Sequence, residues 1–258
     1  TLSLVGLSNA LSTASDLGIT TLTKPDRYGL ALVLGGGEVK PIEMAGAFAT
    51  FGNNGKNNPI APILKVIDKE NTILEEFKEA PNKQVLDPQV AYLLSNILSD
   101  TEARKMVFGF TSSLTIPGHR VAVKTGTTSQ YHDAWTVGYT PQISTAVWAG
   151  NTDNKEMRSG ADGSVVAAPI WNDFMKKYLS TVESVEFDRP SGIQEIAVDF
   201  LSNKLPTDSS PQDGSRTDIF ASWQIPVKKD DIHVKVAVNK LNGKRATDQT
   251  PSDLTEER

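Results

Sequence analysis

The 258-residue sequence contains no cysteine. Disulfide bridges and thiolate metal sites are therefore excluded, while the compartment stays open because many exported bacterial proteins also lack cysteine. Long apolar runs are missing as well. The longest, at 30–34 and 165–171, fall far short of the roughly 20 residues that a membrane-spanning helix needs. We therefore expect no transmembrane segment in this chain, and no targeting segment is visible at its start.

Basic clusters and histidines are also scarce. The net charge is −5, and lysine and arginine form no stripe, so we exclude DNA and RNA as partners. The three histidines, His119, His132 and His233, show no ligand-like spacing with aspartate or glutamate. We therefore expect solvated loop histidines, with no metal site and no cofactor.

The apolar residues, 38% of the chain if tyrosine is included, follow helical and strand periods in turn. Helical spacing and Pro or Gly boundaries predict helices over 4–17, 41–51, 87–98 and 164–179, a β-hairpin over 63–77 and an antiparallel meander over 121–150. In the last helix, Ile170, Phe174 and Tyr178 form one stripe, which we expect to cover the meander. The pattern favours an α/β chain of the α+β type, with an antiparallel sheet flanked by helices.

The composition changes towards the C-terminus, where Ser, Asp, Pro and Lys become frequent. We place a domain boundary near residue 186, which gives one unit at 1–186 and a small β-rich tail at 187–258. Within the tail, Ala197-Val198-Asp199 recurs as Ala237-Val238-Asn239, an offset of 40 residues that later positions share. Each copy predicts a strand followed by a polar turn, so we expect two similar β-hairpins with a stabilising role.

One short segment of the meander carries the residues of a specific chemistry. Lys124-Thr125-Gly126-Thr127 lies at the end of a β-run. A lysine there supplies a fixed positive charge, hydroxyls can hold a carboxylate, and glycine lets a substrate backbone approach the strand. The combination suits acyl transfer from a peptide that ends in a free carboxylate. Taken alone, the same tetrapeptide is also compatible with an exposed turn at the end of a strand.

Further segments make the pattern more specific because they occur in a fixed order and spacing. They lie at 28–39, 47–51, 124–128, 133–141, 148–154, 167–171 and 189–193. With these segments the sequence resembles the C-terminal part of the transpeptidase domain of class A penicillin-binding proteins, which are bifunctional peptidoglycan synthases. The resemblance covers nearly the whole chain. It implies a penicillin-binding transpeptidase fold, truncated at its N-terminus and followed by the small tail.

The resemblance also implies roles for the residues of the strand. Lys124 would belong to the proton relay and electrostatic network. Thr125 and Thr127 would bind the terminal carboxylate of a D-Ala-D-Ala stem peptide or of a β-lactam, with Gly126 and Thr128 in the same substrate-binding set. The backbone N–H of Thr127 would form one half of the oxyanion hole. The family acts on peptidoglycan at the outer face of the bacterial cytoplasmic membrane, so we expect an extracytoplasmic location.

Two motifs of the family are missing from this sequence. No serine is followed three places later by lysine, and no Ser-x-Asn occurs. We expect the serine nucleophile in the missing N-terminal part of the same domain, so the isolated chain is expected to be inactive. Two alternatives stay open. Water could replace the acceptor amine, as in a D,D-carboxypeptidase or β-lactamase, or the chain could be a noncatalytic peptidoglycan-binding or scaffolding module.

Overall fold

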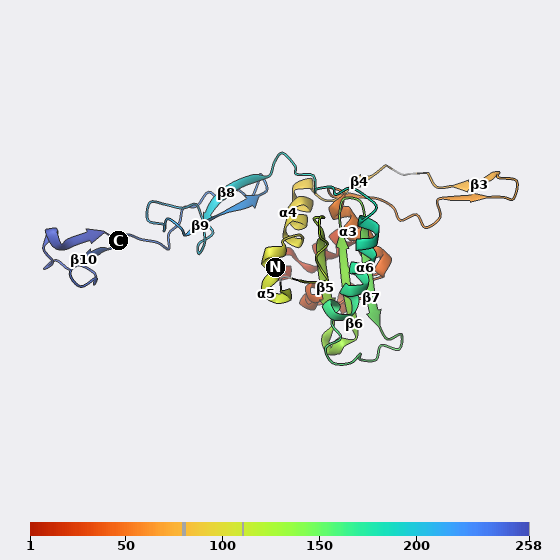
Figure 1. Cartoon of the computed structure of the whole chain (residues 1–258), viewed down its shortest axis with the longest axis horizontal. Helices are drawn as coiled ribbons and strands as arrows, with labels where there is room; N and C mark the ends of the chain where they lie inside the picture. The colour runs from red at the N-terminus through yellow and green to blue at the C-terminus, as the bar shows by residue number, and fades with distance from the viewer. Residues whose placement is uncertain (79–80, 110, 258) are drawn as a thin grey trace. The chain divides into compact units, whose positions relative to one another are not determined.

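The computed structural model describes residues 1–78, 81–109 and 111–257 (Figure 1). The chain divides into two compact units, Thr1–Pro190 and Ser191–Arg258. Within the described part of the chain, no helix has both the length and the apolar character needed to cross a membrane.

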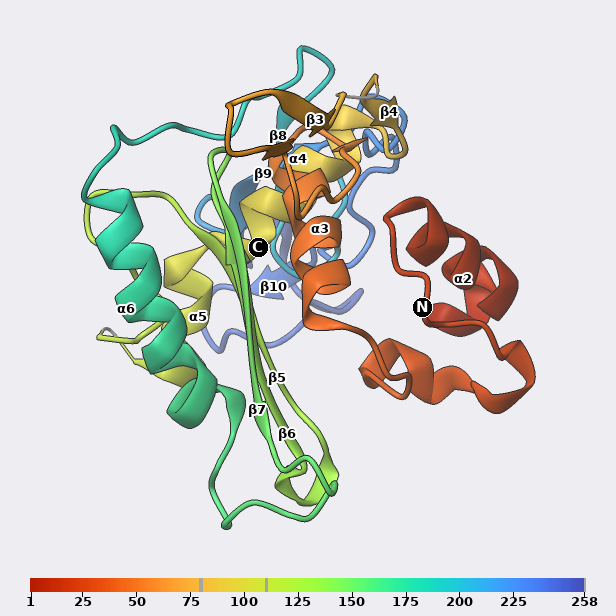
Figure 2. The same cartoon turned by 90° about the vertical axis from the view of Figure 1, so that its right-hand side faces the viewer.

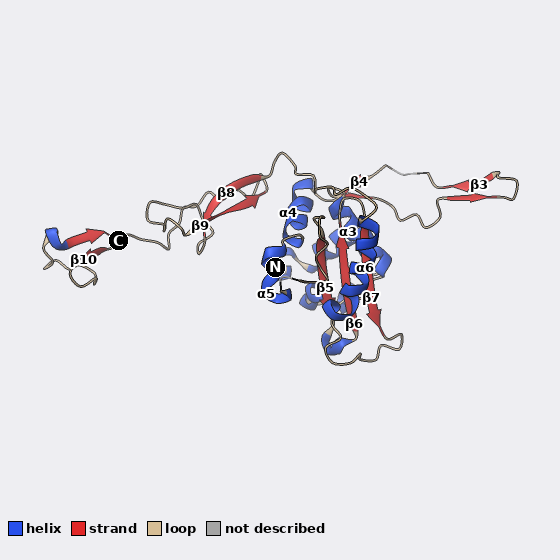
Figure 3. Cartoon of the chain, viewed as in Figure 1, coloured by secondary structure: helices blue, strands red, loops and turns tan. Residues whose placement is uncertain are grey.

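The first unit mixes helices and strands, coloured separately in Figure 3. Its α-helices are α1 (Leu2–Val5), α2 (Leu7–Asp16), α3 (Pro41–Gly52), α4 (Pro88–Leu98), α5 (Thr101–Phe108) and α6 (Ala168–Leu179). Short helical turns are η1 (Pro25–Arg27), η2 (Leu30–Leu34), η3 (Ser129–Tyr131) and η4 (Gly163–Ala167), the last a π-helical turn. The strands are β1 (Lys56–Asn57), β2 (Lys65–Ile67), β3 (Ile73–Glu76), β4 (Lys83–Gln84), β5 (Ala122–Thr127), β6 (Asp133–Tyr139) and β7 (Ser144–Gly150).

The central sheet is the antiparallel meander that the sequence predicts over 121–150. Its strand order is β5-β6-β7. The register is continuous, with Thr127 opposite Ala134 and Asp133 opposite Gly150. The predicted hairpin over 63–77 also forms, as the antiparallel pair β2 and β3. The expected α+β architecture is therefore confirmed.

Helices cover both faces of this sheet, with α3 on one side and α6 on the other (Figure 2). Two neighbouring residues of β6 show how the faces differ, because side chains alternate along a strand. The ring of Tyr139 meets the ring of Phe48 in α3 edge-on, with 5.9 Å between centroids. At Gly138, a Cβ atom would lie only 2.4 Å from the ring of Trp171 in α6. Glycine at position 138 therefore lets the indole pack directly on the backbone.

The helix α6 buries a different face from the one that the sequence predicts. Its buried residues are Ala168, Trp171, Asn172, Met175 and Leu179. Ile170 and Phe174 are instead 56% and 51% exposed, so the predicted stripe is wrong for these two residues, although Tyr178 does pack against the core. Both stripes have helical spacing, and the one containing the large Trp171 ring contacts the sheet.

Helix boundaries follow the local signals of the sequence. The Asp87 side chain caps α4 by accepting a hydrogen bond from Gln89 N at 2.8 Å, directly before Pro88 in the first turn. The predicted helix over 4–17 forms as two pieces, α1 and α2, because the chain bends at Gly6, where φ is +85°. The second piece is followed by Gly18, with φ of +91°, as a left-handed C-terminal stop requires.

The second unit contains two antiparallel hairpins. The first pairs β8 (Gln194–Asp199) with β9 (Ser215–Phe220), and the second pairs β10 (Ala237–Asn239) with β11 (Thr255–Glu257). Their turns repeat the same hydrogen bond at the offset of 40 residues. Asp199 N donates to Lys204 O and Asn239 N donates to Lys244 O, both at 2.8 Å. The sequence repeat is therefore also a repeat of backbone geometry.

Candidate active site

The Lys-Thr-Gly segment lies on β5, at one edge of the three-stranded sheet. Val123 is buried in the core cluster under α6. Because side chains alternate along a strand, Thr125 and Thr127 share the face of Val123, whereas Lys124 points to the opposite face. The Lys124 ammonium is exposed and donates to the Thr125 carbonyl at 2.6 Å.

The backbone N–H of Thr127 points away from the sheet. The next residue, Thr128, donates its N–H to Asp133 O of the neighbouring strand at 3.1 Å. Successive N–H groups of a strand point to opposite sides, and the register is continuous here. The N–H of Thr127 is therefore directed to the free edge of β5, as a donor to an oxyanion would have to be.

The hydroxyl of Thr127 is held by the turn η4. Gly163 N donates to Thr127 Oγ1 at 3.0 Å, and Thr136 Oγ1 donates to Gly163 O at 3.0 Å. A Cβ atom at position 163 would lie 2.3 Å from Trp135 O and 2.6 Å from Gly126 O. Only glycine therefore fits against the strand here. Since Thr127 Oγ1 accepts this bond, its own proton remains available for donation to a carboxylate.

The side chain of Thr128 belongs to the connection between β5 and β6. Its hydroxyl donates to Asp133 Oδ2 at 3.1 Å and accepts from Asp133 N at 2.7 Å. The other oxygen, Asp133 Oδ1, accepts from Trp148 Nε1 at 2.7 Å. Asp133 thus fixes the connection, and the hydroxyl proton of Thr128 is engaged in it. The assignment of Thr128 to substrate binding stays a prediction.

A cavity of about 940 Å³ lies beside β5, and its lining includes Lys124 and Gly126. Apart from these residues, its walls include Trp135 of β6 and Met44 and Phe48 of α3. The rest of the 124–128 segment also lines it, and no serine is found among the lining residues of the described chain. The lining of the cavity therefore combines apolar side chains, two lysines (Lys40 and Lys124) and several hydroxyls, but no serine nucleophile.

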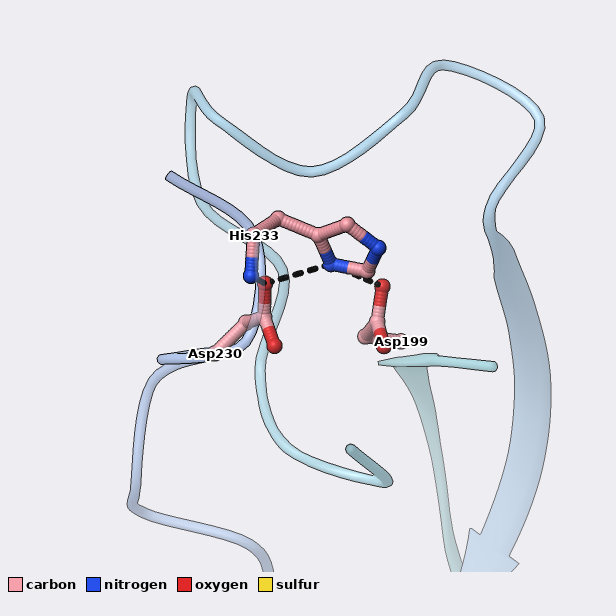
Figure 4. Close-up of side chains that lie close together, drawn as sticks. All are labelled: Asp199, Asp230 and His233. Atoms are coloured by element: carbon pink, nitrogen blue, oxygen red, sulfur yellow. Dashed lines mark hydrogen bonds and ion pairs between the residues drawn. The ribbon is translucent and has the colours of Figure 1, made fainter. Parts of the chain in front are cut away.

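The structure corrects one expectation about the histidines. His233 Nδ1 lies 2.8 Å from Asp230 Oδ2 and 3.3 Å from Asp199 Oδ2 (Figure 4). The expectation of a solvated loop histidine is therefore wrong for His233, whose side chain is 21% exposed and contacts two carboxylates. Asp230 precedes His233 by three residues, a spacing visible in the sequence, whereas Asp199 comes from the distant strand β8 and carries no such signal.

Comparison with known proteins places the chain in a family. Residues 22–176 match the family model described as the penicillin binding protein transpeptidase domain. This match covers more than half of the chain, so the chain belongs to the penicillin-binding protein transpeptidase family.

Within this family, the similarity is to penicillin-binding protein 1A, a class A protein. The chain is 35% identical over 262 aligned positions to penicillin-binding protein 1A of Clostridium botulinum, an alignment that covers 98% of this chain and 31% of the relative. The resemblance to class A proteins that the sequence motifs carry is confirmed. The chain spans about 31% of the length of this relative.

Solved structures agree with this assignment. The crystal structure of penicillin-binding protein 1A from Haemophilus influenzae aligns with a TM-score of 0.74 at 23% identity, covering 89% of this chain and 38% of that one. This likeness shows the fold. The PonA1 protein from Mycobacterium tuberculosis, solved in complex with penicillin V, aligns with a TM-score of 0.58 at 25% identity, covering 70% and 52% of the two chains.

Proposed function

We propose that this chain supplies the Lys-Thr-Gly strand of a serine D,D-transpeptidase that cross-links peptidoglycan stem peptides. The observation that carries the proposal is the arrangement of 124–127. In a chain of this family, the segment lies on an edge strand and lines the cavity, and the Thr127 N–H is directed to the open edge. The substrate places the reaction at the outer face of the cytoplasmic membrane.

The proposed reaction proceeds through an acyl-enzyme on a serine of a Ser-x-x-Lys motif outside this sequence. The serine oxygen attacks the carbonyl of the penultimate D-Ala, and the terminal D-Ala leaves as an amine after receiving a proton. An amine of a neighbouring stem peptide then attacks the ester and releases the serine. β-Lactams acylate the same serine, and the penicillin V complex of the related PonA1 supports this part of the proposal.

The residues of β5 act on the substrate rather than as the nucleophile. Thr125 and Thr127 hold its terminal carboxylate through their hydroxyls, and the charge of Lys124 strengthens this attraction in the apolar-walled cavity. The N–H of Thr127 stabilises the negative oxygen of the tetrahedral intermediate. Gly126 leaves room for the peptide backbone beside the strand.

The test uses a longer protein that includes a Ser-x-x-Lys motif upstream of this sequence. It is incubated with a stem pentapeptide ending in D-Ala-D-Ala and with an amine acceptor, and the products are identified by mass spectrometry. We expect a cross-linked product together with free D-alanine, and we expect Lys124→Met to reduce its rate while Lys65→Met, a change on the exposed hairpin strand β2, does not. Hydrolysed tetrapeptide alone would indicate a carboxypeptidase or β-lactamase-like hydrolase. No product at all would favour a noncatalytic peptidoglycan-binding module.

A further inference from the structure

Asp199, Asp230 and His233 converge within the second unit, and none of them takes part in the proposed reaction. Figure 4 shows the two carboxylates facing the same imidazole. One ligand atom from each residue lies within 4.8 Å of the others. Asp199 is fully buried, Asp230 is 7% exposed, and the His233 side chain is 21% exposed. Among the described residues, no other group of histidine and carboxylate side chains forms such a cluster.

The two oxygens of Asp199 have different surroundings. Oδ1 caps the turn after β8 by accepting from Leu201 N and Ser202 N, both at 2.9 Å. Oδ2 is buried and accepts no hydrogen bond, with His233 Nδ1 at 3.3 Å as its polar neighbour. A buried carboxylate oxygen without a donor is unfavourable unless a cation completes its surroundings.

The second carboxylate is held in place by the backbone around it. Asp230 N donates to Leu205 O at 2.7 Å. Its Oδ2 accepts from Ser210 Oγ at 3.2 Å and lies 2.8 Å from His233 Nδ1. The backbone N–H of His233 also donates to Oδ2, at 3.2 Å. These contacts aim the carboxylate at the imidazole.

The internal repeat shows that the turn itself does not need a carboxylate. Asn239 occupies the position that matches Asp199 in the second hairpin. Its Oδ1 accepts from Leu241 N at 2.9 Å, which is the bond that Asp199 Oδ1 makes to Leu201 N. An amide thus suffices to cap the turn, and the charge and second oxygen of Asp199 are additional features of the first copy.

We propose that Asp199, Asp230 and His233 bind a divalent cation of the Zn²⁺ type. Ligand atoms of a tetrahedral zinc site, with bonds of about 2.0–2.2 Å, lie about 3.3–3.5 Å apart. The Nδ1 of His233 already lies 2.8 Å and 3.3 Å from the two carboxylate oxygens, so small shifts suffice. One imidazole with two carboxylates suits zinc better than magnesium or calcium, which prefer oxygen ligands.

Binding through Nδ1 has a consequence for the proton on the ring. If the ring is an imidazolium, Nδ1 releases its proton to solvent when the metal binds, and Nε2 keeps its own. Asp230 Oδ2 then exchanges a hydrogen bond from Nδ1 for a bond to the metal. Water completes the coordination on the exposed side of His233.

A structural metal would also compensate for the small hydrophobic core of the second unit. In its described part, the buried apolar residues are Ile193, Val198, Ala221 and Val238. A core of this size stabilises a small domain only weakly, and small domains commonly add a disulfide or a metal. The chain has no cysteine, so a disulfide is excluded.

The test uses the untagged full chain after removal of metal with a chelator. Zn²⁺ is titrated by calorimetry and by NMR of the three histidine rings, with the His233 resonances identified from His233→Gln. We expect one Zn²⁺ per chain, a shift confined to the His233 ring, and no comparable binding of Ca²⁺ or Mg²⁺. Asp199→Asn keeps the cap of the turn but removes a ligand, so we expect it to weaken zinc binding by about tenfold or more.

The matched control is Asp231→Asn. It removes the same charge one residue from Asp230, where the carboxylate pairs with Lys204 outside the cluster, and should leave zinc binding unchanged. The proposal is overturned if Zn²⁺ leaves the His233 ring unaffected, or if Asp199→Asn and Asp231→Asn weaken binding equally. The three side chains would then form a metal-free cluster in which the imidazole contacts two carboxylates. If circular dichroism shows that Asp199→Asn does not fold, the NMR titration of the wild-type chain still tests whether Zn²⁺ binds at His233.

Discussion

The hydroxyl of Thr127 has a partner within the protein as well as the proposed partner in the substrate. Gly163 N donates to its oxygen at 3.0 Å, so this oxygen fixes the turn η4, and the hydroxyl proton is still available for donation. A substitution at this position therefore tests two interactions at once. The comparison of valine with serine separates them, because serine keeps the oxygen.

We expect Thr127→Val, in a longer protein that includes the nucleophile, to slow acylation by a β-lactam by the equivalent of about 1–3 kcal/mol, the range for one polar contact left unpaired. Thr127→Ser should acylate at close to the wild-type rate. The rate constant is measured by stopped-flow fluorescence, and circular dichroism checks that the variants fold. Equal rates for wild type and the valine variant would remove Thr127 from the site.

Glu43 is a buried residue whose role depends on its charge. It is 6% exposed, and it accepts hydrogen bonds from Thr20 N at 3.1 Å, Thr20 Oγ1 at 2.7 Å and Thr21 Oγ1 at 3.1 Å. Burial would raise the pKa of this carboxyl, but the Thr20 hydrogen bonds outweigh it and lower the pKa. The charged form thus ties the segment after α2 to α3.

The lowered pKa predicts how stability depends on pH. A group whose pKa is lower in the folded state stabilises the fold above its unfolded pKa, about 4.3 for glutamate, and loses this contribution as pH falls through the folded pKa. We expect Glu43→Gln to be less stable than wild type by about 1–3 kcal/mol at neutral pH, and the gap to shrink below about pH 4. Urea unfolding at several pH values measures this difference in the free energy of unfolding. A gap that does not change with pH would contradict the account, and Glu75→Gln, on the exposed strand β3, is the control.

At the scale of elements, the turn η4 positions the Lys-Thr-Gly strand through backbone contacts. We predict that Gly163→Ala lowers thermal stability and slows β-lactam acylation in the longer protein, because its Cβ would lie 2.3 Å from Trp135 O and must displace the turn. Gly29→Ala is the matched control, since a Cβ at Gly29 has no neighbour within 4 Å. An acylation rate and melting temperature like those of the control would show that η4 does not position β5.

The elements with strong local signals were predictable from the sequence. The helix from Pro41 to Gly52 and the three strands of the meander carry their own boundary residues and periods. The buried face of α6 could not be predicted from the sequence, because α6 has two apolar stripes with helical spacing. Only packing against Gly138 and the core selects the stripe that contains Trp171. The hydrogen bond from Gly163 N to Thr127 Oγ1 joins residues 36 positions apart, and no local sequence pattern predicts it.

At the scale of the whole molecule, the tail is predicted to be separable. The boundary expected near residue 186 lies close to Pro190, where the first compact unit ends. We expect limited proteolysis to cut first between about residues 180 and 195, where the two units join and most side chains other than Phe187 and Ile193 are exposed or half-buried. N-terminal sequencing and intact mass identify the cut. First cuts within Val121–Gly150 would contradict the division into two units.

Covalent labelling by penicillin tests directly whether the serine nucleophile lies outside this sequence. The 258-residue chain contains no Ser-x-x-Lys motif. In the proposed function it would provide a carboxylate clamp and half of an oxyanion hole, without an activated oxygen to attack the lactam. The isolated chain and a longer protein that includes the upstream motif are each incubated with a fluorescent penicillin, denatured and weighed by mass spectrometry. The account predicts no adduct on the isolated chain and one penicillin per molecule on the longer protein. Stoichiometric label on the isolated chain, or none on the longer protein, would contradict it.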